Sequence, residues 1–299
     1  MLNKKDRLGW SVTLNHEGSL LAASRIFDDG KGNNATNAGA VNLFKFMKDG
    51  SVVSAETGTA TYVGTIGYGY DYLDTSDDSE HTETLGSQDV LGKSVAFDKD
   101  ANRLAVSFND KLSEGGTTKP GGVHLYNLTD NLASATYVAT IGDGYSDGKN
   151  VDLSAYMDAK DLFGDGVDLN ETGSRLVISG MLASGNSNTQ SKSGEVMLIK
   201  FDDDAFSSGE IYGIVGSGYG ASNLDIDDQL DSNDQFGRGI SLDRDGDRMA
   251  VTSTYDDGSD DLQTNTGAVY LFTFADTNFS TPEFKGKIGK GYTGSNNYI

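Results

Sequence analysis

The chain has 299 residues, and its 45 acidic side chains against 23 basic ones give a net charge of −22 at pH 7. Such a charge repels phosphate groups, so nucleic acid and anionic membrane surfaces are poor partners. The absence of cysteine excludes disulfides and thiolate metal sites, and no apolar run reaches the ~18–20 residues of a membrane helix, so no membrane insertion is expected.

Three short motifs recur four times along the chain, always in the same order. Asp-x-[Leu/Phe]-Gly-x-[Ser/Gly]-[Val/Ile] begins at Asp6, Asp89, Asp161 and Asp234. Gly-x-Val-x-Leu begins at Gly39, Gly121, Gly194 and Gly267. The motif [Ile/Val]-Gly-x-Gly-Tyr has its first glycine at Gly67, Gly142, Gly216 and Gly289. A long, nearly constant period indicates an array of units that bury their apolar faces only against one another.

The first repeat contains four segments in which apolar and polar residues alternate, around 12–14, 21–23, 41–43 and 62–66. This period of two predicts half-buried strands. Between the first two segments, Asn15-His-Glu-Gly18 has the composition of a tight hairpin, because Asn and Gly tolerate left-handed backbone angles. Extra residues around 50–61 lengthen the connection between the third and fourth segments.

The later repeats contain the same four segments. They lie around 95–97, 104–106, 123–125 and 137–141, then 167–169, 176–178, 196–198 and 211–215, and finally 240–242, 249–251, 269–271 and 284–288. A four-stranded antiparallel meander repeated in tandem is typical of propeller blades. We therefore predict an all-β fold, a β-propeller of four four-stranded antiparallel blades. The alternative is a set of tandem blades shared between subunits of a filament or a paired ring.

The repeats run from end to end, so residues 1–299 are expected to form a single repeat domain. The repeats lie roughly at 6–70, 89–145, 161–219 and 234–292. The segments before the first motif and after the last add up to nearly one connection between repeats. The chain termini are therefore expected to be cut inside an inter-blade linker. The two ends then either meet and close a ring, or the last blade is followed by the first blade of a neighbouring unit.

Acidic residues recur at two places in the repeat, at the start of the first motif and in the hairpin turns, and we expect a different role at each. The aspartate that opens each first motif recurs in register, and we expect it to accept backbone N–H groups at the start of the first strand. Two hairpin turns, Asp98-Lys-Asp100-Ala-Asn102 and Asp243-Arg-Asp245-Gly-Asp247, are calcium candidates. Calcium takes six to eight oxygen ligands, and each turn is short of them unless another loop helps, so a plain hairpin is favoured over a metal site.

These motifs resemble the FG-GAP repeat, the blade unit of integrin alpha-subunit β-propellers and of many secreted bacterial proteins. The resemblance rests on Phe163-Gly164 and Phe236-Gly237, on Leu-Gly in the other repeats, and on the segment 267–272. The [Ile/Val]-Gly-x-Gly-Tyr motif is similar to a variant in large bacterial surface and adhesin-like proteins. The resemblance implies an extracellular or cell-surface location and binding rather than catalysis. The chain departs from it in having four blades rather than seven and shorter acidic turns.

No Ser/His/Asp set, paired-carboxylate motif or phosphate loop stands out, and the histidines fall at unrelated positions of the repeat. We therefore expect no enzyme and no cofactor other than calcium. The function expected is a non-enzymatic structural or adhesive module that associates with protein partners. One form of it is a filament subunit that joins identical subunits head to tail. The alternative is a calcium-dependent glycan-binding module.

Overall fold

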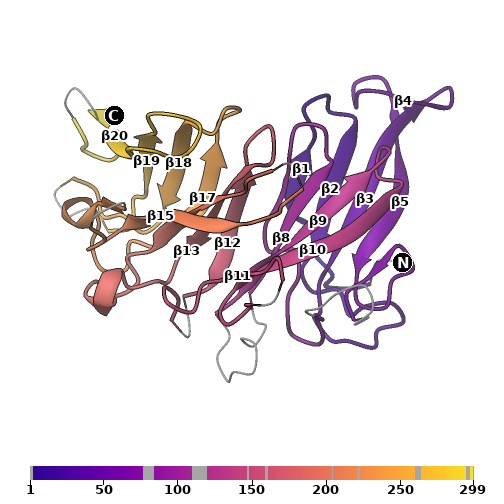
Figure 1. Cartoon of the computed structure of the whole chain (residues 1–299), viewed down its shortest axis with the longest axis horizontal. Coiled ribbons are helices and arrows are strands. Elements are labelled where there is room, and N and C mark those ends of the chain that lie inside the picture. The colour runs from indigo at the N-terminus through magenta and orange to yellow at the C-terminus, as the bar shows by residue number, and fades with distance from the viewer. Residues whose placement is uncertain are drawn as a thin grey trace.

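The computed structural model describes residues 3–76, 84–109, 120–146, 148–158, 161–203, 205–220, 223–259, 264–293 and 297–298. They form four separate small sheets that follow one another in a ring around a common axis, so the chain is a four-blade β-propeller. In Figure 1 the first strands of the blades lie near the middle of the molecule, the outer strands of the fourth blade extend to the left and those of the first blade to the right. The all-β prediction is confirmed.

Each blade uses its strands in chain order from the axis outward. The first blade contains β1 (Leu8–Leu14), β2 (Leu20–Arg25), β3 (Ala40–Lys48), β5 (Thr59–Gly67) and β6 (Leu73–Asp74), with β4 (Ser51–Val52) paired to β3. The second contains β7 (Val95–Phe97), β8 (Arg103–Phe108), β9 (Gly122–Thr129), β10 (Ser134–Gly142) and β11 (Val151–Asp152).

The third and fourth blades repeat this plan. The third contains β12 (Phe163–Leu169), β13 (Arg175–Gly180), β14 (Glu195–Lys200), β15 (Glu210–Gly216) and β16 (Leu224–Asp225). The fourth contains β17 (Phe236–Leu242), β18 (Arg248–Ser253), β19 (Ala268–Thr273), β20 (Glu283–Gly289) and β21 (Asn297–Tyr298). Two short 3-10 turns, η1 (Asn186–Asn188) and η2 (Asp227–Gln229), lie in the connections.

The blades differ from the prediction in one respect, because each has a fifth strand. This outermost strand is only two residues long and pairs in parallel with the fourth, as Ile141 does with Val151. A two-residue strand leaves no alternation for sequence analysis to detect. The extra residues of the first repeat extend β3 and β5 and add β4, so the insertion forms a longer hairpin.

The recurring aspartate has the structural role expected of it. Each one accepts the backbone N–H of the residue three positions earlier and so fixes the turn before the first strand. The donors and distances are Asn3 to Asp6 at 2.6 Å, Gly86 to Asp89 at 2.7 Å, Asp158 to Asp161 at 2.5 Å and Asp231 to Asp234 at 2.9 Å. The same device in all four blades explains why this residue recurs.

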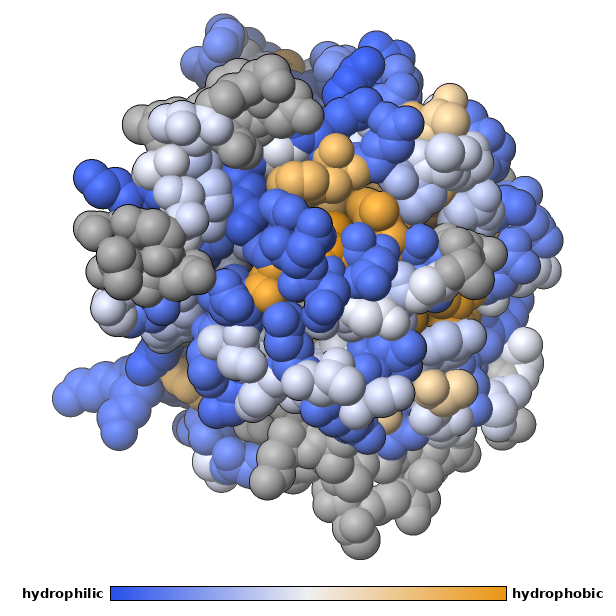
Figure 2. Space-filling model, turned by 90° about the vertical axis from the view of Figure 1, so that its left-hand side faces the viewer, coloured by the Kyte–Doolittle hydropathy of each residue, from blue (hydrophilic) through white to orange (hydrophobic). Residues whose placement is uncertain are grey.

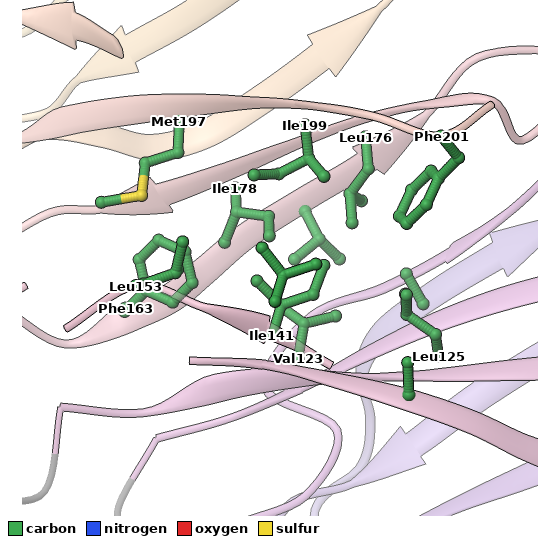
Figure 3. Packing of buried hydrophobic residues seen from close by; sticks show 14 of the residues in the cluster. Val123, Leu125, Ile141, Leu153, Phe163, Leu176, Ile178, Met197, Ile199 and Phe201 are labelled. Atoms are coloured by element: carbon green, nitrogen blue, oxygen red, sulfur yellow. The ribbon is translucent and has the colours of Figure 1, made fainter. Parts of the chain in front are cut away.

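The core lies between neighbouring sheets. Three buried clusters fill the first–second, second–third and third–fourth junctions. Figure 3 shows the middle one, where the second and third sheets face each other through Val123, Leu125, Ile141, Phe163, Leu176, Ile178, Met197, Ile199 and Phe201. At every junction one face of a blade packs against the opposite face of the next, so a blade buries both faces only when it has a neighbour on each side.

Candidate interaction surface

The face that the first blade turns away from the second is apolar and exposed. Leu8, Val12 and Leu14 of β1 are 42%, 59% and 52% exposed. Most of their counterparts are buried where a preceding blade exists: Leu91, Phe163 and Phe236 match Leu8 and are 0% exposed, Val95 and Val167 match Val12 and are 5% exposed, and only Ile240 of the fourth blade is partly buried. The sequence pattern of a buried strand is therefore present in β1, but its covering sheet is absent. We call Leu8, Val12 and Leu14 the first-blade face.

The fourth blade has the complementary surface. Ala250, Val269, Leu271 and Ile288 are only partly buried, whereas the residues matching Leu271 in the other blades, Leu43, Leu125 and Leu198, are at most 1% exposed. We call these four residues the fourth-blade face. A hollow of about 390 Å³ opens over part of it, and Figure 2, which views the side carrying the fourth blade, shows apolar surface framed by hydrophilic residues.

We call the boundary between the fourth-blade face and the first-blade face the seam. Within the described residues, the backbone hydrogen bonds that join neighbouring blades elsewhere are missing there. In the turns after the first strands, His16 N–H donates to the Lys99 carbonyl (2.8 Å), Lys99 to Glu171 (3.0 Å) and Glu171 to Arg244 (2.9 Å). Within the described residues the two ends of this series, the Arg244 N–H and the His16 carbonyl, have no backbone partner. One is a donor and the other an acceptor, so they match each other.

A second series of contacts ends in the same way. Leu91 N–H donates to the Ala38 carbonyl (2.8 Å), Phe163 to Pro120 (2.7 Å) and Phe236 to Ser193 (2.8 Å). These bonds form the three parallel bridges that join adjacent blades. In the described part of the chain, the matching pair, the Leu8 N–H and the Thr266 carbonyl, is not joined. The seam therefore interrupts both series of backbone hydrogen bonds between blades, and it also exposes apolar side chains.

Arginines at the start of the second strand reach across two of the internal junctions. Arg103 donates to the Thr172 carbonyl of the third blade, and Arg175 Nε donates to the Thr277 carbonyl of the fourth at 2.6 Å. Arg248 is the matching residue of the fourth blade, and its side chain is 68% exposed. The residue of the first blade that corresponds to Thr172 is Glu17, which is exposed. Arg248 pairs with Asp243 of its own turn at 3.1 Å, and an acidic residue thus lies at the matching place on the first blade.

The central axis carries a polar groove of about 340 Å³. The variable residue after the Leu/Phe-Gly pair lines it in every blade, as Trp10, Lys93, Asp165 and Arg238. Asp165 is buried and accepts bonds from Lys93 Nζ (3.0 Å) and Asn109 Nδ2 (3.1 Å). Four segments far apart in the sequence thus bring two cations, one anion and an indole together.

The calcium candidates lie in hairpins whose carboxylates already have donors. Asp243 Oδ1 accepts the N–H groups of Gly246, Asp247 and Arg248, each at 3.0 Å. Asp98 Oδ1 accepts those of Asn102 (2.8 Å) and Arg103 (3.0 Å). In the part of the chain that the structure describes, no three His, Cys, Asp or Glu side chains gather as a metal site. Calcium binding by Asp98, Asp100, Asn102, Asp243, Asp245 and Asp247 stays a prediction.

Thermal unfolding tests calcium binding directly. A ligand that binds the folded chain raises its melting temperature by mass action. We expect millimolar calcium or a chelator to leave the melting temperature unchanged, because backbone N–H and arginine groups already surround Asp98 and Asp243. A rise with calcium that is lost in Asp243→Asn, and kept in the control Asp276→Asn, would instead establish the fourth-blade turn as a calcium site.

Glu195 is a buried acid that the motif analysis did not single out. It occupies the variable position of Gly194-Glu-Val, where the other blades have Ala40, Gly122 and Ala268. The side chain is 1% exposed, and burial raises its pKa to about 8. The Tyr219 hydroxyl donates to Oε2. Tyr219 belongs to the third motif, and Tyr70 and Tyr292 at the same position bond to Asp28 and Asp256. This tyrosine therefore anchors a buried carboxyl group.

The raised pKa of Glu195 predicts a pH-dependent stability. The unfolded chain ionises this residue near pH 4.5, whereas the folded chain keeps its proton up to about pH 8. The folded state thus binds more protons in this window, so the free energy of unfolding falls as pH rises through it. We expect the native protein to lose several kcal/mol more than Glu195→Gln between pH 5 and pH 8. Urea unfolding of both proteins measures this, and parallel pH profiles would contradict it.

Comparison with protein-family models and with curated proteins gives no match. Solved structures give distant likenesses. A "putative 6-phosphogluconolactonase" of Bacteroides fragilis is 12% identical with a TM-score of 0.42, and the alignment covers 93% of this chain and 70% of that one. The periplasmic gluconolactonase of Pseudomonas aeruginosa is 13% identical (TM-score 0.42; 93% and 56%). A complex of KlAtg21 with the coiled coil of AgAtg16 is 10% identical (TM-score 0.44; 94% and 57%).

These likenesses are too distant to give this chain a reaction, ligand or partner. The propeller implied by the FG-GAP resemblance is confirmed, but no family model supports membership of the FG-GAP family. The prediction that the chain is not an enzyme is contradicted, because similar structures are described as gluconolactonases. That prediction was based on a search for linear motifs. Such a search does not detect side chains from separate blades that the fold gathers in one place, as it does in the groove. Among the described residues, no helix is long and apolar enough to span a membrane.

Proposed function

We propose that this chain is a protein-association module whose copies join head to tail. The fourth-blade face of one copy would pack against the first-blade face of the next. The observation that carries the proposal is the exposure of Leu8 at 42%, when Leu91, Phe163 and Phe236 at the same position are 0% exposed. Equivalent faces of neighbouring blades already pack together at three internal junctions. The first-blade face of a second copy therefore has the shape needed to cover the fourth-blade face.

The joint would satisfy each group left open at the seam. Arg244 N–H would donate to the His16 carbonyl of the next copy, and Leu8 N–H to a Thr266 carbonyl, as their counterparts do inside the chain. Arg248 would meet Glu17. Burying the remaining exposed part of each large apolar side chain contributes about 1 kcal/mol. A pair of unlike faces that meets in this way is heterologous, and it either closes a ring of copies or continues as a filament.

The extracellular or cell-surface location and the adhesive role belong to this proposal. They rest on the resemblance of the repeat motifs to surface proteins. Glycan binding in the calcium-dependent form stays a separate prediction, and the calcium test above bears on it. The acidic surface, with a net charge of −22, keeps copies apart except where a complementary contact outweighs repulsion. Association is therefore expected to strengthen with salt, because added ions screen that repulsion.

Sedimentation velocity over a range of protein concentrations tests the proposal. We expect the sedimentation coefficient to rise with concentration and with salt. A single dimer boundary that grows no further would indicate closure between two copies, and a continuing series would indicate a filament. Protein that stays monomeric throughout, with salt and with calcium, would remove head-to-tail association as its function.

A further inference from the structure

The central groove has a feature that head-to-tail association does not use. The side chain of Arg238 is 46% exposed, and its single ion pair within the described residues joins Nε to Asp165 Oδ2 at 4.0 Å. It makes no hydrogen bond within the described residues. Lys93, by contrast, is held at 3.0 Å from Asp165 Oδ1. The guanidinium therefore offers a fork of donors to the cavity, while Lys93 neutralises the neighbouring carboxylate.

The charge at this place is opposite to that of the molecule. Lys93 and Arg238 against Asp165 leave the groove with a net positive charge, although the chain as a whole carries −22. Charges lining a concave site focus the field within it and raise the local concentration of ligands of opposite sign. Arginine is suited to carboxylate, because its planar donors match two oxygens at once. The groove is thus built to attract an anion.

Trp10 adds an apolar wall to the same cavity. Its side chain is 41% exposed, and its ring lies 5.3 Å from Lys93 Nζ. A large flat ring beside polar groups is suited to pack on the C–H face of a sugar. The volume of about 340 Å³ is at the lower end for ligand sites, which fits a small molecule. Serine hydroxyls from Ser11 and Ser94 lie in the same lining.

We infer that the central groove binds a small acidic sugar, a monosaccharide that carries a carboxylate. Arg238 pairs with the carboxylate and Trp10 covers the ring, while Asp165 fixes Lys93 beside them. This site needs neither calcium nor the seam, and it is separate from head-to-tail association. It concerns binding alone and assigns no reaction.

Trp10 is the only tryptophan in the chain, so its fluorescence reports on the groove directly. The titration uses the full chain with Leu271→Asp, which keeps copies apart at the seam. Glucuronate is the probe, glucose is the matched neutral sugar and inorganic phosphate is the matched simple anion. Arg238→Gln tests the arginine, and Arg244→Gln is the control, because Arg244 is an exposed arginine outside the groove.

We expect glucuronate to change the Trp10 emission with saturation, glucose to have no effect, and Arg238→Gln to weaken binding at least tenfold while Arg244→Gln does not. Melting temperatures confirm that the variants fold. Equal responses to glucuronate and glucose, a response to phosphate alone, unaltered binding by Arg238→Gln, or no response at all would each overturn the inference. None of these results bears on the seam, which sedimentation tests separately.

Discussion

A chain that carries Leu271→Asp should stay monomeric at concentrations at which the parent protein associates. Leu271 lies on the fourth-blade face and is only partly buried, so an aspartate there meets water in the single chain and the fold survives. In the head-to-tail joint the same carboxylate would be buried in apolar surroundings without a partner. That costs several kcal/mol, so we expect the association constant to fall by at least ~100-fold.

The polarity of the joint gives a sharper test. Val12→Asp blocks the first-blade face, and Leu271→Asp blocks the fourth-blade face. Each variant alone should be monomeric, yet an equimolar mixture should form a dimer and nothing larger, because one free face of each kind remains. Tyr156→Asp is the control, since Tyr156 is 45% exposed away from the seam. A mixture that stays monomeric while the parent associates would show that the copies meet through other surfaces.

Gly194→Ala should unfold the protein or cost more than ~3 kcal/mol, because an added methyl group would overpack a closed junction. Gly194 has φ +88°, and a Cβ there would overlap the backbone of Phe236 in the next blade. The added Cβ and the Phe236 backbone could move apart only if the third and fourth blades separated. Gly39 and Gly121 stand in the same relation to Leu91 and Phe163. Chemical denaturation, or the yield of soluble protein where the variant does not fold, measures the loss.

Gly267→Ala is the matched control, because Gly267 has the same motif position and a similar φ of +75°. Within the described residues, the nearest atoms to a Cβ there are 3.6 Å away. Only the left-handed backbone opposes alanine, at about 1–2 kcal/mol. The folded variant should nevertheless associate weakly, because its methyl group would occupy the place that Leu8 of the next copy needs. Equal losses of stability in both variants would contradict the role of the blade contact.

The four-blade fold could be predicted from the chain because its local signals agree with one another. Alternation marks each long strand, Asn15 and Asp98 mark hairpins, and the aspartates such as Asp6 mark the turn into β1. These are short-range effects, in which a residue acts on its own strand or turn. The two-residue fifth strands, such as β11, were missed because their pairing depends on where the preceding strand lies. The calcium turns and the domain limits stay predictions.

The functional surfaces could not be predicted in the same way. Val12 and Val95 look alike in the sequence, and only the placement of the sheets makes one exposed and the other buried. Trp10, Lys93 and Arg238 occupy a variable position of a motif. They form a candidate site only because the arrangement of the blades brings them into one groove. Glu195 is an acidic residue at a position of the motif where the other blades have alanine or glycine, and this difference is visible in the sequence. Its raised pKa, however, results from burial, which only the folded structure shows.

The repeat, the strands and the turns follow from the amino-acid order alone, because they depend on residues close together in the chain. Which apolar faces lack a neighbour and which charges share a cavity follow only from the way the blades pack together. Both depend on contacts between blades that are more than seventy residues apart, such as Glu171 with Arg244. A periodic sequence specifies each blade almost equally, and the difference between an inner and an outer blade arises only when the blades are assembled.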